Sequence, residues 1–489
     1  MKKAFLCGIV LLLPFLLLFP GLPEPEESGR RRFEQILELI NDRHPGPPDQ
    51  ETMVFASIHG FLQKLDPHSR FLDPPTLRAT LEDQKGNYNG IGIRITRFED
   101  RLTIVSTMAG MPAAEAGLRA GDVISEVDGR PTVEMRLEEA MDSLRGKKGS
   151  SVNLLVRRDG VATELPFSLR RAPIPLHSIG YALLYPEDER IAYISLQSFS
   201  RTTRAELQNA LERLLARGAR SLILDLRGNP GGSLQAAIET ADLFLPVGRV
   251  IVSVRGRAHS STMYAEKEDL YEKMPLVVLI NRGSASASEI VAAALQENER
   301  AVVIGRRSWG KGLVETLFSL PLGSALALTT ARYYTPADNS LQRDFSNSDD
   351  YLYFREAEDY DQNDSIQGGV IPDMVVAARP YPPELAGFSS RGLYFSFALA
   401  FLEIQPVTDS SFLVDDRILA DFIAYAVDRD FSLNDAEQAA YGNEIKEMLS
   451  REILALAFNA ETALLFALQH DLQAARAKEN LTEILEAAE

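Results

Sequence analysis

Hydrophobic and polar positions repeat with two different periods along the chain, and the changes of period divide it into parts. Residues 24–84 carry apolar positions at helical spacing, as in FEQILELINDRH and TMVFASIHGFLQKL, so this N-terminal region is predicted to be helical. Residues 85–172 change to short strand-like runs around one amphipathic helix, RLEEAMDSLRG, which predicts a small β-rich domain. Its predicted strands are YNGIGIRI, RLTIVSTM, an alternating strand after the Gly-Asp turn in AGLRAGDVISEVDGRP, SSVNLLVRRDG and, after a turn at Arg158, Asp159 and Gly160, VATELPFSL.

Residues 173–378 alternate between strands and helices, which predicts a layered α/β core. Residues 379–489 are mostly helical and carry no chemical motif, so we expect them to serve packing or homo-oligomer formation through the C-terminal helices. The fold class is therefore multidomain α/β. Within the core, strands are expected in IAYISLQSF, SLILDLR, PLVVLIN and RAVVIG, and helices in TRAELQNALERLLARG, GGSLQAAIETADLFL and ASEIVAAALQEN.

The N-terminus has the pattern of an export segment. Lys2 and Lys3 precede an apolar run over residues 4–19, which predicts that residues 1–23 are an export signal or a membrane anchor. The run is short for a membrane span, Pro14 interrupts it, and no clear small-residue cleavage site follows. A cleaved signal and attachment to the membrane through residues 4–19 both stay open. Either one places the protein in the periplasm or on the extracytoplasmic face of the membrane.

Composition excludes several classes of function. The chain of 489 residues has 69 acidic and 51 basic residues and a formal net charge of −18, which argues against non-specific binding to nucleic acid. The single cysteine, Cys7, lies in the export segment, so no thiol nucleophile or thiolate metal site is expected in the rest. The six histidines are scattered without an H-E-x-x-H motif, and we expect neither a metal nor a cofactor.

The segment GRRSWGKG, which contains Lys311, nearly matches a phosphate-binding P-loop. Gly312 stands where that loop needs Ser or Thr, and the following GLVETLFSLPLG alternates like a strand instead of forming a helix. Lys311 is therefore not expected to bind phosphate. A lysine can act as a base when burial or a nearby cation lowers its proton affinity, and it then needs a nucleophile within hydrogen-bond reach.

A candidate nucleophile lies upstream in LINRGSASASEIVAAAL. A buried strand is expected to end at Ile280, and a helix to start near Ser286 or Ser288, where the free amide of Ala287 could hold a developing oxyanion. The same residues also fit a capping box, Ser286-x-x-Glu289, which would be purely structural. The pattern leaves both interpretations open.

Two further turns carry candidate residues. In DLRGNPGGSL, Gly231 and Gly232 let backbone amides approach a ligand closely, although such a turn is more often structural. His68, in DPHS, is a candidate base, but its setting is more typical of a turn residue.

Taken together, the chain resembles the carboxyl-terminal processing peptidases, or tail-specific proteases, which are serine peptidases with a Ser/Lys pair and an embedded PDZ domain. The resemblance covers roughly residues 30 to 378. It implies a layered α/β protease core similar to crotonase and Clp protease, with the PDZ domain at residues 85–172. The motifs that carry it are DPHSRFLDP, YNGIGIRI, AGLRAGDVISEVDG, DLRGNPGGSL, GSASASEIVAAALQ, GRRSWGKGLVE, TTARYYTPADNSLQ and GGVIPD.

The resemblance implies catalytic roles for particular residues. It makes Ser286 the nucleophile and Lys311 the general base, and it assigns the oxyanion amides to Gly231 or Gly232 and to Ala287.

One position departs from the family. Many members carry Gln four residues after the lysine, where it orients the amine, but this chain has Glu315. An ionised Glu315 in contact with Lys311 would favour the ammonium form, so we predict activity at more alkaline pH than in a relative with Gln.

The implied PDZ domain suggests how substrates are chosen. A peptide would add as a strand, and its terminal carboxylate would meet a loop formed by Asn89, Gly90, Ile91 and Gly92. A plain β-turn is the alternative for this loop. The expected partners are proteins or peptides with apolar C-termini.

The sequence therefore predicts an exported serine endopeptidase that cleaves protein substrates near their C-termini. Two rivals stay open. One is a non-catalytic PDZ scaffold or adaptor in which Ser286 only caps a helix, and the other is a non-peptidase acyl-transfer enzyme on a related core.

Overall fold

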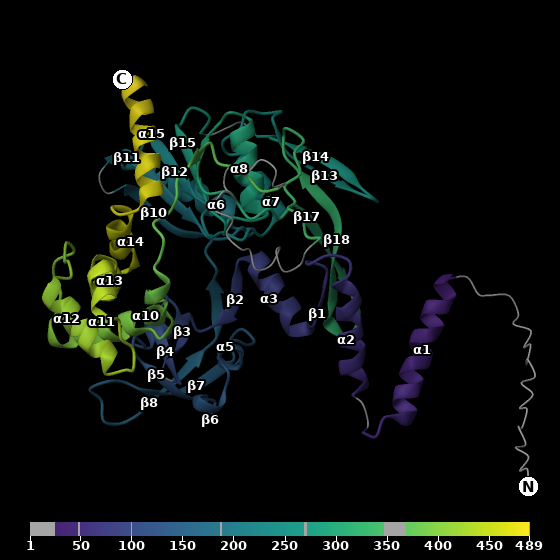
Figure 1. Cartoon of the computed structure of the whole chain (residues 1–489), viewed down its shortest axis with the longest axis horizontal. Coiled ribbons are helices and arrows are strands. Elements are labelled where there is room, and N and C mark those ends of the chain that lie inside the picture. The colour runs from purple at the N-terminus through teal and green to yellow at the C-terminus, as the bar shows by residue number, and fades with distance from the viewer. Residues whose placement is uncertain are drawn as a thin grey trace, which may run out of the picture. The chain divides into compact units, whose positions relative to one another are not determined.

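The computed structural model describes residues 25–46, 49–98, 100–185, 188–267, 271–346 and 368–488 (Figure 1). The expected export segment, residues 1–23, lies outside the described residues. The chain divides after Leu65 into two compact units. The first unit contains the two helices that the periodicity predicts, α1 (Pro25–Arg43) and α2 (Gln50–Leu62).

A β-rich part of the second unit forms around an apolar core that includes Leu102, Ile124 and Val152. Its strands follow the order β3-β4-β5-β7-β8, with β6 paired to β5. The elements are β3 (Ile93–Phe98), β4 (Arg101–Thr107), α4 (Pro112–Glu115), β5 (Val123–Val127), β6 (Arg130–Pro131), α5 (Leu137–Leu144), β7 (Ser151–Arg157) and β8 (Leu165–Arg170).

Two strand predictions in this part need correction. The second strand of the hairpin begins at Leu165 and not at Val161, because Arg158 leaves the hairpin and binds the Asp122 carboxylate at 2.7 Å. The run YNGIGIRI is divided into β2 (Asn87–Gly90) and β3, because Gly92 takes a φ of +77°. A side chain at Gly92 would also collide with Met111, since a Cβ would lie 2.5 Å from the Met111 Cβ.

The predicted α/β core is a six-stranded sheet that is parallel from β11 onward. Alternate strand residues point to opposite faces. One set, including Ile194 and Val278, packs against α6, α7 and α8. The strands, in sheet order, are β10 (Ile179–Tyr185), β11 (Asp188–Leu196), β12 (Ser221–Asp225), β15 (Leu276–Ile280), β16 (Val302–Gly305) and β19 (Met374–Val375), and the helices are α6 (Thr203–Ala216), α7 (Leu234–Ala241) and α8 (Ala287–Glu297).

A second, antiparallel sheet accompanies the core and was not predicted, apart from the strand that follows Lys311. Its order is β1-β18-β13-β14, and β17 pairs with β18. The strands are β1 (Arg70–Leu72), β13 (Val250–Gly256), β14 (Ser260–Tyr264), β17 (Leu313–Ser319) and β18 (Ala325–Tyr334). A P-loop needs a helix directly after its lysine, but Lys311 is followed by the strand β17, so a P-loop is excluded there.

The C-terminal region is helical, as predicted. Among the described helices, none is by itself long and apolar enough to span a membrane. The bent pair Pro383–Ser390 and Leu393–Ile404 reaches that length and apolar composition only when the two helices are taken together. An aromatic cluster that includes Phe388 and Phe422 holds the first helices together. The elements are α10 (Ala386–Ser390), α11 (Leu393–Ile404), α12 (Asp416–Val427), α13 (Asp435–Ala457), α14 (Ala460–Leu468) and α15 (Leu472–Ala488).

Candidate active site

Ser286 stands at the junction between strand β15 and helix α8, where the sequence predicted it. Its backbone has φ 54° and ψ −111°, which is a strained conformation for a residue with a side chain. Such strain costs about 1–3 kcal/mol and persists only where the surroundings fix it, often at functional sites. The serine lines a cleft of about 820 Å³ that also contains Lys311, Glu315 and Gly232.

The capping interpretation of Ser286 is only partly realised. Ser286 and Glu289 are placed as in a capping box, and the Ser286 amide donates to Glu289 Oε2 at 2.7 Å. The Ser286 side chain, however, makes no cap hydrogen bond to the helix. Its hydroxyl is therefore not committed to the helix end and lies at the cleft.

Glu289 does more than cap the helix, and the sequence analysis missed this. Its side chain is completely buried, and both oxygens accept hydrogen bonds. Oε1 accepts from the Ser308 hydroxyl and the Gly310 amide, each at 2.6 Å, and Oε2 also accepts from the Lys311 amide at 2.9 Å. Burial raises the pKa of Glu289, while these donors oppose the shift. One carboxylate thus ties the Ser286 turn to the Lys311 loop.

Lys311 and Glu315 form an ion pair, as the sequence analysis anticipated for an ionised Glu315. Lys311 Nζ lies 2.8 Å from Glu315 Oε1, and the side chains are 26% and 20% exposed. Glu315 is the third residue of β17, and it follows a bulge in the pairing with β18. The amine at the cleft is therefore paired with a carboxylate in this structure.

His68 lies closer to these groups than its turn-like sequence suggested. It does occupy a turn, since its amide donates to Asp66 Oδ1 at 2.8 Å. Its ring also approaches the ion pair, with Nδ1 3.9 Å from Glu315 Oε1. Burial, and next the Lys311 ammonium, lower the pKa of His68 to about 4, against the opposing effects of Glu315 and Asp66.

The glycine turn after β12 supplies one well-placed amide. The Gly231 amide is already used, because it donates to Asn229 Oδ1 at 2.9 Å. Phe199 bonds to the carbonyl of Gly231 and the amide of Ser233, so the intervening Gly232 amide points the other way. Gly232 lines the same cleft as the candidate serine.

The turn and the helix start are in close contact. A Cβ added to Gly231 would lie 2.9 Å from both the Ala287 nitrogen and the Ser286 Cβ. Ala287 is the first residue of α8, so its amide has no acceptor within the helix. Of the predicted oxyanion residues, Gly231 thus has its amide bonded to Asn229, which leaves the amides of Gly232 and Ala287 as the candidates.

The β-rich part has a groove of about 220 Å³ between β3 and α5. Of the four residues predicted for a carboxylate loop, Gly90, Ile91 and Gly92 line it. Asn89 does not, because it alternates in β2 with Tyr88 and Gly90, which line the groove, and so faces the other way into a separate cleft. The sequence analysis missed the other wall of the groove, which α5 and its C-cap provide through Met141, Leu144 and Arg145.

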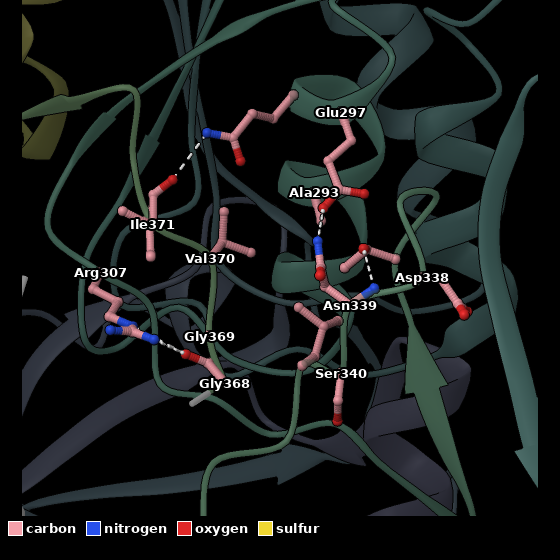
Figure 2. A pocket seen from close by; sticks show the side chains of 13 residues that line it. Ala293, Glu297, Arg307, Asp338, Asn339, Ser340, Gly368, Gly369, Val370 and Ile371 are labelled. Carbon is pink, nitrogen blue, oxygen red and sulfur yellow. Dashed lines mark hydrogen bonds between the residues drawn. The ribbon is translucent and has the colours of Figure 1, made fainter. Parts of the chain in front are cut away.

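Another cavity, of about 560 Å³, contains neither candidate catalytic residue (Figure 2). Two of its polar side chains are bonded within its own wall, whereas Asp338 pairs with Arg255 outside it. Arg307 Nη2 donates to the Gly368 carbonyl at 2.7 Å, and Asn339 Nδ2 lies 3.3 Å from Glu297 Oε1. Across the described ranges of the chain, no three His, Cys, Asp or Glu side chains gather as metal ligands would.

Comparison with known protein families finds two matches along the chain. Residues 190–376 match the model of peptidase family S41, and residues 103–158 match a PDZ domain. The chain is 37% identical over 348 residues to a carboxy-terminal-processing protease of Bartonella bacilliformis, covering 69% of this chain and 79% of that protein. It is also 37% identical over 313 residues to the carboxy-terminal processing protease CtpA of Bacillus subtilis, covering 63% and 66%.

Solved structures give similar neighbours. A photosystem II D1 C-terminal processing protease is 28% identical with a TM-score of 0.40, covering 72% of this chain and 88% of that one. The PDZ domain of a carboxy-terminal protease from Vibrio cholerae, in complex with peptide, is 33% identical with a TM-score of 0.18, covering 18% and 99%.

Proposed function

The chain belongs to peptidase family S41, among the carboxy-terminal processing proteases, and we propose that Ser286 is its nucleophile and Lys311 its general base. It is a serine-type endopeptidase that acts near the C-termini of protein substrates. The observation that carries the assignment is the strained Ser286, held at a helix start with its side chain uncommitted, in the same cleft as a lysine amine.

In the proposed mechanism, neutral Lys311 Nζ takes the proton from Ser286 Oγ as the oxygen attacks the scissile carbonyl carbon. The Gly232 and Ala287 amides donate to the oxyanion that develops. The tetrahedral intermediate collapses, the amine leaves with the proton from Lys311, and an acyl-enzyme remains. Water then attacks the ester with Lys311 again as base, which releases the acid and restores the serine.

The Lys311–Glu315 ion pair sets a condition on this mechanism. An amine that is protonated and paired at 2.8 Å cannot accept the serine proton. The lysine must lose its proton, and this becomes easier at higher pH or when Glu315 is neutral or turned away. We therefore expect activity to rise with pH.

The PDZ groove is proposed to select the substrate. A C-terminal peptide would add as a strand beside β3, with its last side chain against Ile91, Met141 and Leu144 and its carboxylate near Gly92. These apolar walls favour apolar C-termini. With the Ser286→Ala variant, which cannot consume the peptide, binding should be tighter for a free carboxylate than for the amidated peptide. Equal affinities would contradict this role.

Export is proposed through residues 1–23, with action in the periplasm or on the extracytoplasmic face of the membrane. A reporter enzyme that is active only outside the cytoplasm, fused after residue 30, should be active. It should lose activity when the apolar run is interrupted by charged residues.

The test of the catalytic assignment is cleavage of an unstructured protein with an apolar C-terminal tail at several pH values. Ser286→Ala and Lys311→Ala should both abolish cleavage. Lys446→Ala is the control, since Lys446 lies on α13 in a surface ion pair with Asp416. Cleavage that survives Ser286→Ala would overturn the assignment. A wild type that neither cleaves nor reacts with a serine-directed probe would favour a PDZ scaffold.

A further inference from the structure

The last helix of the chain, α15, covers the face of the six-stranded sheet that α8 leaves open. It contacts β12, β15 and β16. Its side chains Ala474, Ala477 and Leu481 are fully buried there. The strand residues on this face include Tyr193, Ile223, Val277, Leu279 and Ile304. The C-terminal helix therefore completes the core of the peptidase domain.

The three strands beneath α15 lead to the three parts of the proposed site. The glycine turn follows β12, the Ser286 turn follows β15, and the Lys311 loop follows β16. An element that rests on these three strands is well placed to influence how the three loops are positioned relative to one another.

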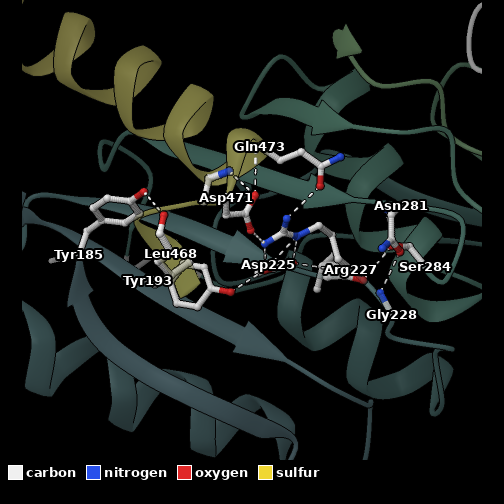
Figure 3. A network of polar contacts seen from close by, with 12 residues as sticks. Tyr185, Tyr193, Asp225, Arg227, Gly228, Asn281, Ser284, Leu468, Asp471 and Gln473 are labelled. Carbon is white, nitrogen blue, oxygen red and sulfur yellow. Dashed lines mark hydrogen bonds and ion pairs between the residues drawn. The ribbon is translucent and has the colours of Figure 1, made fainter. Parts of the chain in front are cut away.

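A polar network joins the start of α15 to the glycine turn (Figure 3). Arg227 Nη2 lies 2.7 Å from Asp471 Oδ2, and Arg227 Nη1 donates to Gln473 Oε1 at 2.9 Å. The other Asp471 oxygen accepts from the Gln473 and Ala474 amides, and so caps the helix. Gln473 also donates to the Val376 carbonyl at 2.7 Å.

Arg227 stands at the head of the glycine turn. Its guanidinium also lies 2.6 Å from Asp225 Oδ2, at the end of β12, and Asp225 accepts from the Tyr193 hydroxyl. The next residue, Gly228, donates to Asn281 Oδ1 at 2.9 Å, and Asn281 directly follows β15. A continuous chain of contacts thus runs from α15 through Arg227 to the turns after β12 and β15.

These charges are largely shielded from water. The side chains of Arg227, Asp225 and Asp471 are 17%, 7% and 24% exposed. Burial alone would raise the pKa of Asp471, but the Arg227 guanidinium and the helix amides hold it below its usual value. Without the Asp471 charge, Arg227 stays paired with Asp225 but loses its ion pair to α15, so the guanidinium is no longer held from both sides.

We propose that Asp471 and Gln473 are positioning residues for the peptidase reaction, which act through Arg227 to hold the turn at Gly228–Gly232 where its amide meets the oxyanion. This inference rests on the proposed function. It gives the C-terminal helix a part in catalysis, although the helix lies outside the motifs that identify the family.

The test uses the full-length chain with Asp471→Asn, because Asn still caps a helix but carries no charge. We expect kcat for a quenched fluorescent peptide, and the labelling rate of Ser286 by a fluorophosphonate, to fall roughly 10-fold with KM within twofold. Loss of an oxyanion donor costs about 100- to 1000-fold, and a displaced donor should cost a part of that. Hydrogen exchange in a peptide spanning residues 226–234 should become faster.

The matched control is Leu481→Ala, which weakens the packing of α15 without touching Arg227. It should lower the thermal midpoint but leave kcat and turn exchange unchanged at 25 °C. An equal loss of kcat in this control would mean that general destabilisation is the cause, and would overturn the proposal. If Asp471→Asn does not fold, Gln473→Met removes the hydrogen bond from Arg227 to Gln473 and should give a smaller change of the same kind.

The same experiment separates the two proposals. Unchanged exchange in the turn of Asp471→Asn overturns the positioning role, whatever the activity. Faster exchange in an enzyme whose cleavage survives Ser286→Ala supports the link to the turn but refutes the catalytic assignment. If Asp471 acts through Arg227, Asp471→Asn should cause no further loss of kcat in an Arg227→Lys background. A full additional loss would contradict it.

Discussion

Replacing Glu289 by Gln should damage both the stability and the activity of the enzyme. Each oxygen of the buried carboxylate accepts two hydrogen bonds. A glutamine keeps one acceptor oxygen and turns an NH₂ group toward two donors. The loss of two hydrogen bonds to a charged group, at about 1.5–3 kcal/mol each, lowers the free energy of unfolding by about 3–6 kcal/mol. Domains of ordinary stability have only about 5–15 kcal/mol in total.

The effect on catalysis follows from which amides share an oxygen. Glu289 Oε2 accepts from the amides of both Ser286 and Lys311, so it fixes the backbone of the proposed nucleophile relative to that of the base. A displacement of about 1 Å between reacting groups can cost roughly 100-fold in rate. We expect kcat/KM of Glu289→Gln to fall by about this factor under conditions where the variant is folded.

The assay combines urea unfolding with peptide cleavage for wild type, Glu289→Gln and a control, Glu212→Gln. Glu212 is an exposed residue of α6 whose carboxylate accepts a hydrogen bond from the Gln208 side chain, so its change should stay within about 0.5 kcal/mol. The reasoning fails if Glu289→Gln unfolds within about 0.5 kcal/mol of wild type. It also fails if kcat/KM stays within twofold.

Three further predictions concern the candidate site and its surroundings. Glu315→Gln removes the ion pair of the lysine amine, so the rising limb of the pH–rate profile should move to lower pH, and coincident profiles would refute this. His68 has a pKa of about 4 against 6.5 when unfolded, so the stability it contributes above pH 6.5 is lost as pH falls toward 4, by at most about 3 kcal/mol. In His68→Phe the urea midpoint should therefore depend less on pH over this range. An unchanged pH dependence would contradict the lowered pKa of His68. Gly232→Ala places a Cβ 2.1 Å from the Phe199 carbonyl oxygen, so kcat should fall by roughly 100-fold or more. Gly218→Ala, which is also at a positive φ but has open space around its Cβ, should retain activity.

Local patterns were sufficient to predict where Ser286 lies. The buried strand that ends at Ile280, the turn and the helix that starts at Ala287 all have their signals within a few residues of one another. The pairing of this serine with Lys311 in one cleft came from the resemblance to the family. The hydrophobic periodicity of single segments does not indicate which loops of a sheet lie close together.

Contacts between distant segments could not be predicted. Glu289 fits a local capping box, and the sequence does not show that the same carboxylate also accepts from Gly310 and Lys311, about twenty residues further on. Asp471 lies still further from Arg227, in a helix without any chemical motif. The second sheet was missed for the same reason, since β13 and β18 pair across a long stretch of intervening chain.

The geometry of the site depends on both faces of one sheet. The loops after β12, β15 and β16 leave neighbouring parallel strands, which brings them to one edge but does not fix their conformation. Glu289, on α8, binds the loops after β15 and β16. Arg227 links the loop after β12 to α15 on the other face of the sheet. The strained backbone of Ser286 needs such surroundings, because about 1–3 kcal/mol of strain would otherwise relax. A buried charge on each face is therefore placed to hold Ser286, the proposed nucleophile, and the loops beside it.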